Sequence, residues 1–202
     1  MLWGVVSDSL IIAGDSQSAA RTPVTLAQTW GSLLACRMGL GYTNCAVSGN
    51  TSADLLARFP AVLANPGSHI GIMIGANDAF ADPGYTGSYP YPNAAAVDTF
   101  SANLASMITQ ARAAGKTPFY VTPWAFWSTP SMENFPFYVD AAKALMASLS
   151  VPVVDAFQIQ FEIAEDIGQT TMWDEIEVNY QHPNALGHFL IYLYAKQVLG
   201  IA

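Results

Sequence analysis

The sequence contains few charged residues and few basic ones in particular. Only 11% of its 202 residues are charged, compared with about 25% in an average globular protein. Hydrophobic residues make up 52%, which is the opposite of the composition of a disordered chain. Seven Lys and Arg residues oppose 15 Asp and Glu residues, and they form no basic stripe, so we expect no nucleic-acid partner.

Long hydrophobic runs are also missing. The longest ones, such as residues 10–13 and 70–74, are far shorter than the roughly 20 residues of a membrane-spanning helix. The first residues show no basic segment before a hydrophobic one, so no signal peptide is predicted, and an extracellular or surface location is only slightly favoured. Cys36 and Cys45 are too few for a disulfide framework, and two buried thiols are expected rather than one disulfide.

Neutral polar residues take the place of the missing charges. Ser, Thr, Asn and Gln total 45 residues, about twice the number of charged ones. A surface of this kind suits a neutral, hydroxyl-rich ligand, and it equally suits a domain that docks into a larger assembly.

Short apolar segments alternate with segments of helical periodicity along the whole chain. The sequence predicts strands at residues 10–13, 43–47, 70–74, 118–122 and 151–154. It predicts helices at about residues 26–38, 52–59, 98–114, 137–149 and 184–199. This alternation predicts one α/β domain over residues 1–202, a three-layer α/β/α sandwich around a five-stranded parallel sheet. Ligands of such folds bind beyond the carboxyl ends of the strands.

Polar, glycine-containing motifs follow the predicted strands at that end of the sheet. Gly-Asp-Ser-Gln-Ser occupies residues 14–18, and Ser-Gly-Asn-Thr-Ser occupies residues 48–52. Gly-Ala-Asn-Asp occupies residues 75–78, and Gln-His-Pro-Asn occupies residues 181–184, before the last predicted helix. Each motif alone is a weak signal. Their order and their shared position at strand ends together indicate one site.

Ser16, Gly49 and Asn77 have the chemistry of a serine nucleophile and its oxyanion hole. A hydrolytic serine needs a base, a group that orients the base, and donors for the oxyanion. Ser16 is predicted to lie at a strand-to-helix turn, with its hydroxyl toward the crevice and its backbone N–H toward the developing negative charge. Gly49 offers a second backbone N–H, and Asn77 offers a side-chain amide.

The small number of histidines identifies the base. His69 precedes the third strand, on the wrong side of the sheet, and His188 lies inside the last predicted helix, where a packing or surface role is favoured. His182 lies in a loop beside Pro183 and can reach the carboxyl ends of the strands, so it is the predicted base. No cluster of His, Cys and Asp suggests a metal site, and no organic cofactor is expected.

The four motifs together resemble the four blocks of the SGNH (GDSL-type) hydrolases. The resemblance extends from residue 10 to the final helix. It implies a flavodoxin-like fold and esterase or lipase-like chemistry, with Ser16 as nucleophile, His182 as base, and Ser16, Gly49 and Asn77 as the oxyanion hole. The lipase elbow Gly-x-Ser-x-Gly is absent because Ser18 stands in place of the second glycine, which disfavours the α/β-hydrolase fold.

Asn179 departs from the family pattern, in which an aspartate stands three residues before the histidine. An asparagine oxygen can accept the ring N–H and orient the imidazole, but it contributes no charge. Three interpretations follow: Asn179 is a neutral orienting residue, a nearby carbonyl or carboxylate replaces it, or activity is impaired. The nearby carboxylates are those of Asp174, Glu175 and Glu177. The first interpretation is favoured.

Two long aromatic-rich segments, residues 79–97 and 124–136, follow strand ends on the predicted ligand side. Tyr91, Trp124 and Trp127 are candidates for substrate contact, and packing of these rings onto the sheet is an equal alternative.

These observations predict a serine esterase that removes a small acyl group, preferably acetyl, from a small-molecule or glycan ester. The carbohydrate part depends only on the polar composition and the aromatic segments. A lysophospholipase or thioesterase is the alternative enzyme. A different class is a catalytically impaired glycan-binding or structural module of a larger surface or virion protein. The retention of Ser16, Gly49, Asn77 and His182 favours the enzyme. The oligomeric state is left open.

Overall fold

Five parallel strands form the middle layer of the computed structural model, which describes residues 8–82, 93–125, 131–168, 176–178 and 181–202. The strand order is β2-β1-β3-β4-β5, and every neighbouring pair is parallel. The strands are β1 (Ser9–Gly14), β2 (Gly41–Asn44), β3 (His69–Met73), β4 (Thr117–Val121) and β5 (Val153–Val154). The prediction of a five-stranded parallel sheet is confirmed.

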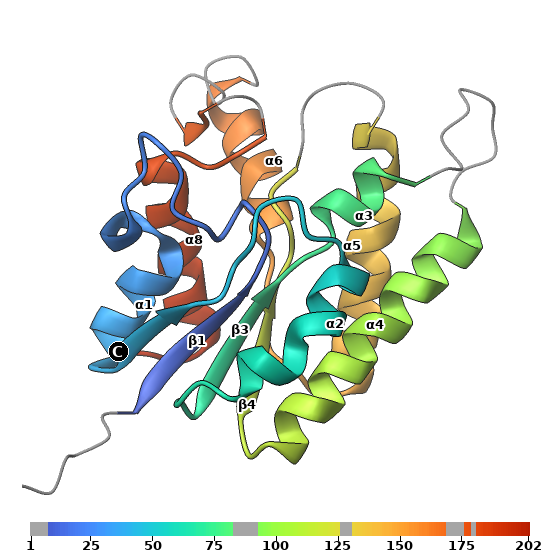
Figure 1. Cartoon of the computed structure of the whole chain (residues 1–202). Helices are drawn as coiled ribbons and strands as arrows, with labels where there is room; N and C mark the ends of the chain where they lie inside the picture. Colours follow the sequence, from blue (N-terminus) through green and yellow to red (C-terminus); the bar gives the residue numbers. More distant parts are fainter. Residues whose placement is uncertain (1–7, 83–92, 126–130, 169–175, 179–180) are drawn as a thin grey trace, which may run out of the picture.

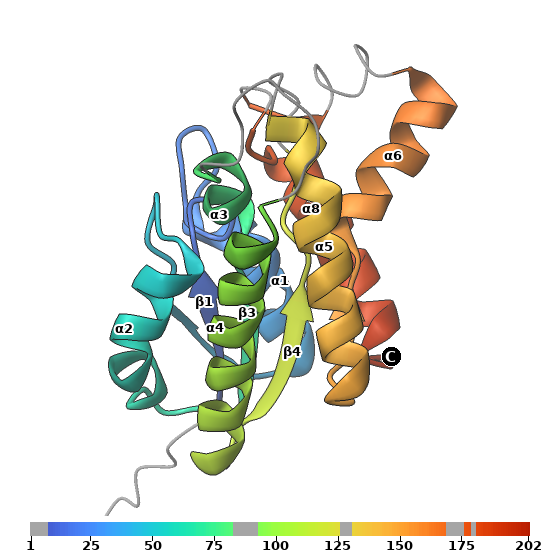
Figure 2. The same cartoon turned by 90° about the vertical axis from the view of Figure 1, so that its right-hand side faces the viewer.

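Helices cover both faces of the sheet (Figures 1 and 2). One face carries α1 (Trp30–Met38) and α8 (Ala185–Val198), which pack against each other. The opposite face carries α2 (Ser52–Leu63), α4 (Ala94–Ala113) and α5 (Ser131–Ser148). These layers confirm the three-layer α/β/α architecture.

Strand β1 shows why the sheet needs helices on both faces. Leu10 and Ile12 contribute to the core below α1 and α8, whereas Ile11 and Ala13 contribute to the core below α2, α4 and α5. All four side chains are fully buried. Because side chains alternate between the faces of a strand, a continuous apolar run of this kind belongs to a strand that is covered on both sides.

Several helices differ from the sequence prediction. The predicted helix at residues 26–38 is divided into a short 3-10 helix, η1 (Leu26–Gln28), and α1. Helix α2 continues through Pro60, and α4 and α5 begin at Ala94 and Ser131, inside the two segments that were expected to be loops. Of the helices in the described ranges, α3 (Ala76–Phe80) and α6 (Ala156–Ile167) were not predicted.

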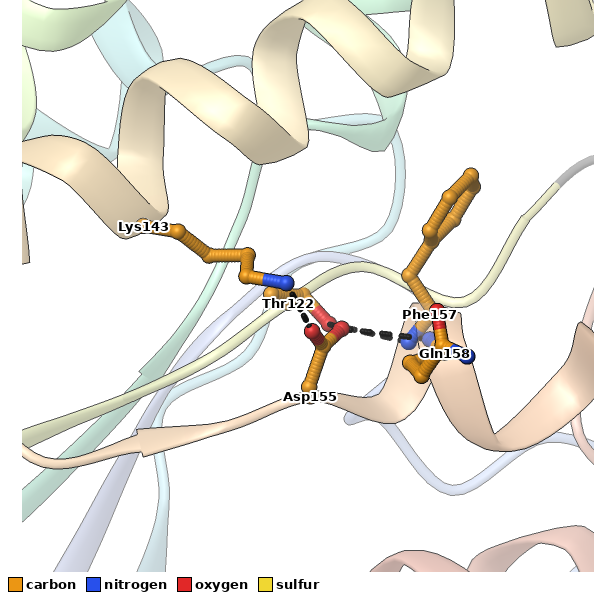
Figure 3. A network of polar contacts seen from close by, with 5 residues as sticks. All are labelled: Thr122, Lys143, Asp155, Phe157 and Gln158. Atoms are coloured by element: carbon orange, nitrogen blue, oxygen red, sulfur yellow. Dashed lines mark hydrogen bonds and ion pairs between the residues drawn. The ribbon is translucent and has the colours of Figure 1, made fainter. Parts of the chain in front are cut away.

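Asp155 accounts for the start of α6, as Figure 3 shows. Its Oδ1 accepts hydrogen bonds from the Thr122 hydroxyl and from the Gln158 backbone N–H, both at 3.1 Å. The Thr122 hydroxyl accepts in turn from the Phe157 N–H at 2.9 Å, and Lys143 of α5 forms an ion pair with the carboxylate. An aspartate before the first helical turn satisfies N–H groups that lack a partner in the helix. The network therefore joins the end of β4 to α5 and α6.

The two cysteines do not form a disulfide. Cys36 is exposed and Cys45 is half-buried, and both thiols are free. The expectation of a buried thiol is therefore wrong for Cys36, because this residue lies on the outer side of α1. None of the helices in the described ranges is both long and apolar enough to cross a membrane.

Candidate active site

The hydroxyl of Ser16 lies beside the imidazole of His182. Their Oγ and Nε2 atoms are 2.9 Å apart, and both residues are almost buried, with 8% and 6% of their surface exposed. The two residues are 166 positions apart in the sequence. A hydroxyl within hydrogen-bond distance of an imidazole is the arrangement in which histidine can take the proton of a serine nucleophile.

Gly49 and Asn77 lie at the same site. They line a cavity of about 230 Å³ together with Ser16, His182, Arg21 and Phe80. Gly49 has φ +81°, and an added Cβ there would meet no atom within 4 Å, so its backbone borders open space. Asn77 donates one amide hydrogen to the backbone oxygen of Asn50 at 2.9 Å. An amide has two such hydrogens, so the second is available to a ligand.

Ser16 follows β1 in a tight turn. The Asp15 carboxylate accepts the Gln17 N–H at 2.9 Å, and the Ser18 N–H reaches the Asp15 carbonyl at 3.2 Å. The expected strand-to-helix turn is wrong in its second half, because the next helical segment is η1, which begins only at Leu26. The turn still places Ser16 beyond the carboxyl end of the sheet, the end at which α3 lies in Figure 1.

His182 is held by the segment that begins α8. The Asn184 side chain caps this helix by accepting the N–H groups of Leu186 and Gly187 at 2.9 and 3.1 Å. The His182 carbonyl accepts the Val178 N–H at 2.9 Å. The helix cap and this backbone contact fix His182 at the edge of the sheet. The motif His-Pro-Asn thus combines a base with a helix start.

Gln17, a residue without a predicted role, joins the two segments of the site. Its fully buried amide accepts the Trp124 N–H at 2.9 Å and donates to the carbonyls of Trp124 and Gln181 at 2.6 and 3.2 Å. Gln17 follows the serine directly and Gln181 precedes the histidine directly. One side chain therefore connects the serine turn, the end of β4 and the histidine segment.

Arg58 of α2 is a second residue that the sequence analysis missed. Its guanidinium donates to the carbonyls of Gly14 and Cys45 at 3.2 and 2.7 Å and to the Asn50 side chain at 2.6 Å. It therefore ties the ends of β1 and β2 to the segment that contains Gly49. No motif marks Arg58, whose partners lie 8, 13 and 44 positions away in the sequence.

Arg21 is the third residue that the sequence analysis missed. Its Nη1 lies 3.4 Å from Nε2 of His182. Burial lowers the pKa of His182 to about 4, and the positive charge of Arg21 adds to this decrease. The imidazole is therefore neutral at neutral pH, as a general base must be.

One fully buried carboxyl group, that of Asp15, and one partly buried carboxyl group, that of Asp78, lie below the site. Burial raises the pKa of Asp15 to about 7, and the neighbouring charge of Asp78 contributes to the increase. Burial also raises the pKa of Asp78, although Ser52 opposes this by donating its N–H and hydroxyl to the carboxylate at 2.8 and 2.6 Å. These bonds connect α3 to the start of α2.

Trp124 does not face the cavity, and its expected substrate contact is wrong. Its side chain is fully buried, and the indole N–H donates to Glu177 at 3.0 Å. Glu177 Oε1 also accepts from Gln160 at 2.9 Å. The ring fills the core below α8 because β4 ends there.

Three other predicted residues, Tyr91, Trp127 and Asn179, lie outside the described residues, so their roles stay predictions. The other two histidines are located as expected. His69 begins β3 at the amino end of the strand, and His188 is buried inside α8, where its Nδ1 is 3.4 Å from the Trp30 N–H. Within the described ranges, no three His, Cys, Asp or Glu residues form a group that could hold a metal ion.

A three-layer fold with a serine–histidine pair at the carboxyl ends of its strands is the architecture of a serine hydrolase. Residues 12–190 match the profile of the GDSL-like lipase/acylhydrolase family, and the chain belongs to this family. Over 115 residues it is 36% identical to esterase TesA of Pseudomonas aeruginosa. The aligned part is 54% of this chain and 51% of TesA, so it spans about half the length of that curated relative.

Solved structures show the same fold. Axe2, an acetylxylan esterase from Geobacillus stearothermophilus, is 19% identical with a TM-score of 0.75, over 96% of this chain and 95% of Axe2. LAE5, a hydrolase from the metagenome of Lake Arreo in Spain, is 19% identical with a TM-score of 0.76, over the same shares of the two chains. At these identities the likeness concerns the fold alone.

Proposed function

We propose that this protein is a serine esterase that forms an acyl-enzyme on Ser16, with His182 as the general base. The observation that carries the proposal is the 2.9 Å contact between Ser16 Oγ and His182 Nε2, at a cavity that Gly49 and Asn77 also line. The proposal thus takes its nucleophile, its base and its oxyanion donors from four separate segments of the chain.

In the first step, Ser16 Oγ attacks the ester carbonyl carbon and its proton passes to His182 Nε2. The carbonyl oxygen becomes an oxyanion, which the backbone N–H groups of Ser16 and Gly49 and the free amide hydrogen of Asn77 stabilise. The carbon–oxygen ester bond then breaks, and His182 gives its proton to the leaving alcohol. In the second step His182 takes a proton from water, which attacks the carbonyl carbon of the acyl-enzyme. The bond from this carbon to Ser16 Oγ then breaks, His182 returns the proton to Ser16, and the acid leaves.

The acyl group is acetyl, and the alcohol is a hydroxyl-rich compound such as a carbohydrate. The size of the cavity, about 230 Å³, supports a small acyl group. Phe80 is 58% exposed at its edge and offers an apolar surface to an acetyl methyl group. The excess of neutral polar residues over charged ones supports a hydroxyl-rich alcohol. Axe2, with the same fold, is named an acetylxylan esterase.

The test is covalent labelling with a fluorophosphonate, followed by mass spectrometry. We expect one adduct on Ser16, and none in Ser16→Ala or when the protein is unfolded before labelling. Acetate release from acetylated sugars, compared with release of octanoate from matched esters, then tests the small acyl group. Absence of labelling above the Ser16→Ala background would overturn the proposal.

Asn77→Ala tests the oxyanion hole separately. Loss of one such donor lowers kcat by about 100- to 1,000-fold. We expect this decrease for hydrolysis of 4-nitrophenyl acetate, with an unchanged circular dichroism spectrum. An unchanged kcat would remove Asn77 from the oxyanion hole.

A further inference from the structure

Arg21 differs in what it contacts from four other basic residues, Arg58, Arg112, Lys116 and Lys143. Arg58, Arg112 and Lys116 donate to backbone carbonyls, and Lys143 forms an ion pair with Asp155. Arg21 is exposed, and it makes no ion pair with any carboxylate of the described residues. Its side chain instead lies against the base of the site, 3.4 Å from His182 Nε2, and lines the cavity.

The position of Arg21 opposes the function of the base. His182 Nε2 has one lone pair, and an N–H of Arg21 competes for it with the Ser16 hydroxyl, which lies at 2.9 Å. The positive charge also disfavours the imidazolium that forms when His182 takes the proton of Ser16. A group with negative charge in the cavity would remove both effects, because it would bind the guanidinium and compensate its charge.

The side of the site on which Arg21 lies identifies the part of the substrate that it meets. His182 gives its proton from Nε2 to the leaving alcohol, so the alcohol lies next to this nitrogen. Arg21 contacts the same nitrogen, whereas Gly49 and Asn77 are placed to bind the carbonyl oxygen. The contacts of His182 Nε2 with Arg21 Nη1, at 3.4 Å, and with Ser16 Oγ, at 2.9 Å, limit the distance between Nη1 and Oγ. A substrate group that binds Nη1 is therefore only a few bonds from the reacting ester.

We propose that Arg21 binds a carboxylate on the alcohol part of the substrate, so that the natural substrate is the acetyl ester of a hydroxy acid or sugar acid. The inference rests on the proposed esterase function and specifies its substrate class. A guanidinium binds a carboxylate through two parallel hydrogen bonds. A single positive charge matches one carboxylate, whereas the second charge of a phosphate would be uncompensated in a chain of net charge −8. The described residues that line the cavity include no carboxylate that would repel such a substrate.

The reaction of such a substrate is ordinary ester hydrolysis. Ser16 Oγ bonds to the acetyl carbon, the ester bond breaks, and the proton of Ser16 reaches the alcohol oxygen through His182. The free hydroxy acid leaves, and water then releases acetate from Ser16. The carboxylate takes no part in bond formation. It holds the guanidinium away from the lone pair of Nε2 and positions the alcohol.

The test compares 3-acetoxybenzoate with its neutral counterpart 3-acetoxybenzamide, with acetate release as the measurement. We expect kcat/KM to be at least about 10-fold higher for the carboxylate, mainly through KM, and this preference to weaken in 0.5 M salt, because screening reduces the attraction between the charges. In Arg21→Met the ratio of the two kcat/KM values falls to about 1, and Arg21→Lys retains part of it. Arg37→Met, which removes an exposed charge on α1, keeps the wild-type ratio.

A second measurement does not require turnover. In competition with fluorophosphonate labelling of Ser16, 3-hydroxybenzoate protects at a concentration at least about 10-fold lower than 3-hydroxybenzamide, and Arg21→Met abolishes the difference. Equal values for the acid and the amide in either assay, or a preference that survives Arg21→Met, would overturn the inference. If Ser16 is labelled and the two esters react equally, only the inference about Arg21 fails. If Ser16 is not labelled at all, the esterase proposal itself fails.

Discussion

Gln17 is the side chain that keeps the serine and histidine segments at a fixed separation. Its fully buried amide makes three hydrogen bonds. It accepts one from the Trp124 N–H and donates two, to the carbonyls of Trp124 and Gln181. A glutamate of the same shape cannot donate these bonds, and in its charged form it would place a carboxylate beside two carbonyl oxygens. The residue therefore positions the base through the backbone of its neighbour, without touching the substrate.

Gln17→Glu tests this positioning role. We expect kcat for 4-nitrophenyl acetate to fall by about 10- to 100-fold with a smaller change in KM, because a small displacement between nucleophile and base slows the chemical step more than binding. Gln197→Glu, at an exposed position on α8, is the matched control and keeps the wild-type kcat. A Gln17→Glu protein that retains both its fold and its kcat would contradict the assignment.

His182 determines the acidic limit of activity. Its pKa is lowered to about 4 by burial and then by Arg21. Among the described residues, the charge of His182 also acts on His188, whose pKa is lowered to about 4, mainly by burial. The reaction needs the neutral imidazole, so the rate of Ser16 labelling is expected to stay constant down to about pH 5 and to fall near pH 4. In Arg21→Met this limit moves to higher pH, but not as far as 6.5, because burial persists. A wild-type limit near pH 6.5, or equal limits in Arg37→Met and Arg21→Met, would contradict this prediction.

At the scale of the elements, the close approach of β1 and β3 determines where the serine turn begins. An added Cβ on Gly14 would lie 2.2 Å from the backbone oxygen of Met73, which cannot move without separating the two strands. The Gly14 carbonyl also accepts the N–H of Val47 at 3.0 Å and a hydrogen bond from Arg58. The glycine of the Gly-Asp-Ser motif thus allows β1 and β3 to approach each other, and its backbone carbonyl also binds the segment after β2 and Arg58 of α2.

Gly14→Ala is therefore expected to destabilise the protein strongly, by more than about 3 kcal/mol, because neither backbone can move away from the clash. Urea unfolding measures the effect. Gly39→Ala is the comparison, because an added Cβ there meets no atom within 4 Å. The φ of +68° at this position favours glycine. We therefore expect the free energy of unfolding to decrease by only about 1 kcal/mol, from backbone strain alone. If both variants lose the same free energy of unfolding, the contact with Met73 is not the cause.

The sequence predicts the regular elements well where local signals are strong. The apolar run of β1 and the periodicity of α4 are local patterns, and both elements are found. Helix α6 was missed although Asp155 and Gln158 form the cap-like pattern of a helix start. Helix α3 has only five residues, which is too short for periodicity to show. Residues 94–97 and 131–136 belong to α4 and α5, although the prolines and aromatic residues near them are typical of loops.

The residues of the candidate site also fall into two groups, those that local motifs predict and those that they do not. Ser16, Gly49, Asn77 and His182 could be predicted because each belongs to a short motif at a strand or helix end. The partners of Gln17 and Arg21 are 107 and 161 positions away in the sequence, so no local pattern connects them. Trp124 was assigned to the ligand side because it follows β4, but the ring turns into the core, where the Glu177 carboxylate accepts its N–H. Side-chain direction beyond a strand end depends on tertiary packing.

At the scale of the whole molecule, the chain has few charged residues, so its buried titratable groups are important for the free energy of unfolding. The fold buries the Asp15 carboxyl completely, and its Oδ2 has no hydrogen-bond partner among the described residues. Burial lowers the pKa of His182 and His188 to about 4, so they release protons that the unfolded chain still binds below pH 6.5. The two histidines thus make the free energy of unfolding decrease as the pH falls from about 6.5 to 4.

Asp15 acts in the opposite direction. Its pKa is about 7 in the folded protein, where Asp78 is the neighbouring carboxylate, and near 4 in the unfolded chain. Between these values the folded state binds the proton that the unfolded state has released, so this group makes the free energy of unfolding decrease as the pH rises from about 4 to 7. Asp15→Asn removes the effect and keeps an oxygen that accepts the Gln17 N–H. We expect the variant to match the wild type near pH 4 and to be more stable at pH 8, by on the order of 4 kcal/mol. Urea unfolding at both pH values measures this, with the exposed Asp98→Asn as control, and an equal difference from wild type at both pH values would contradict the prediction.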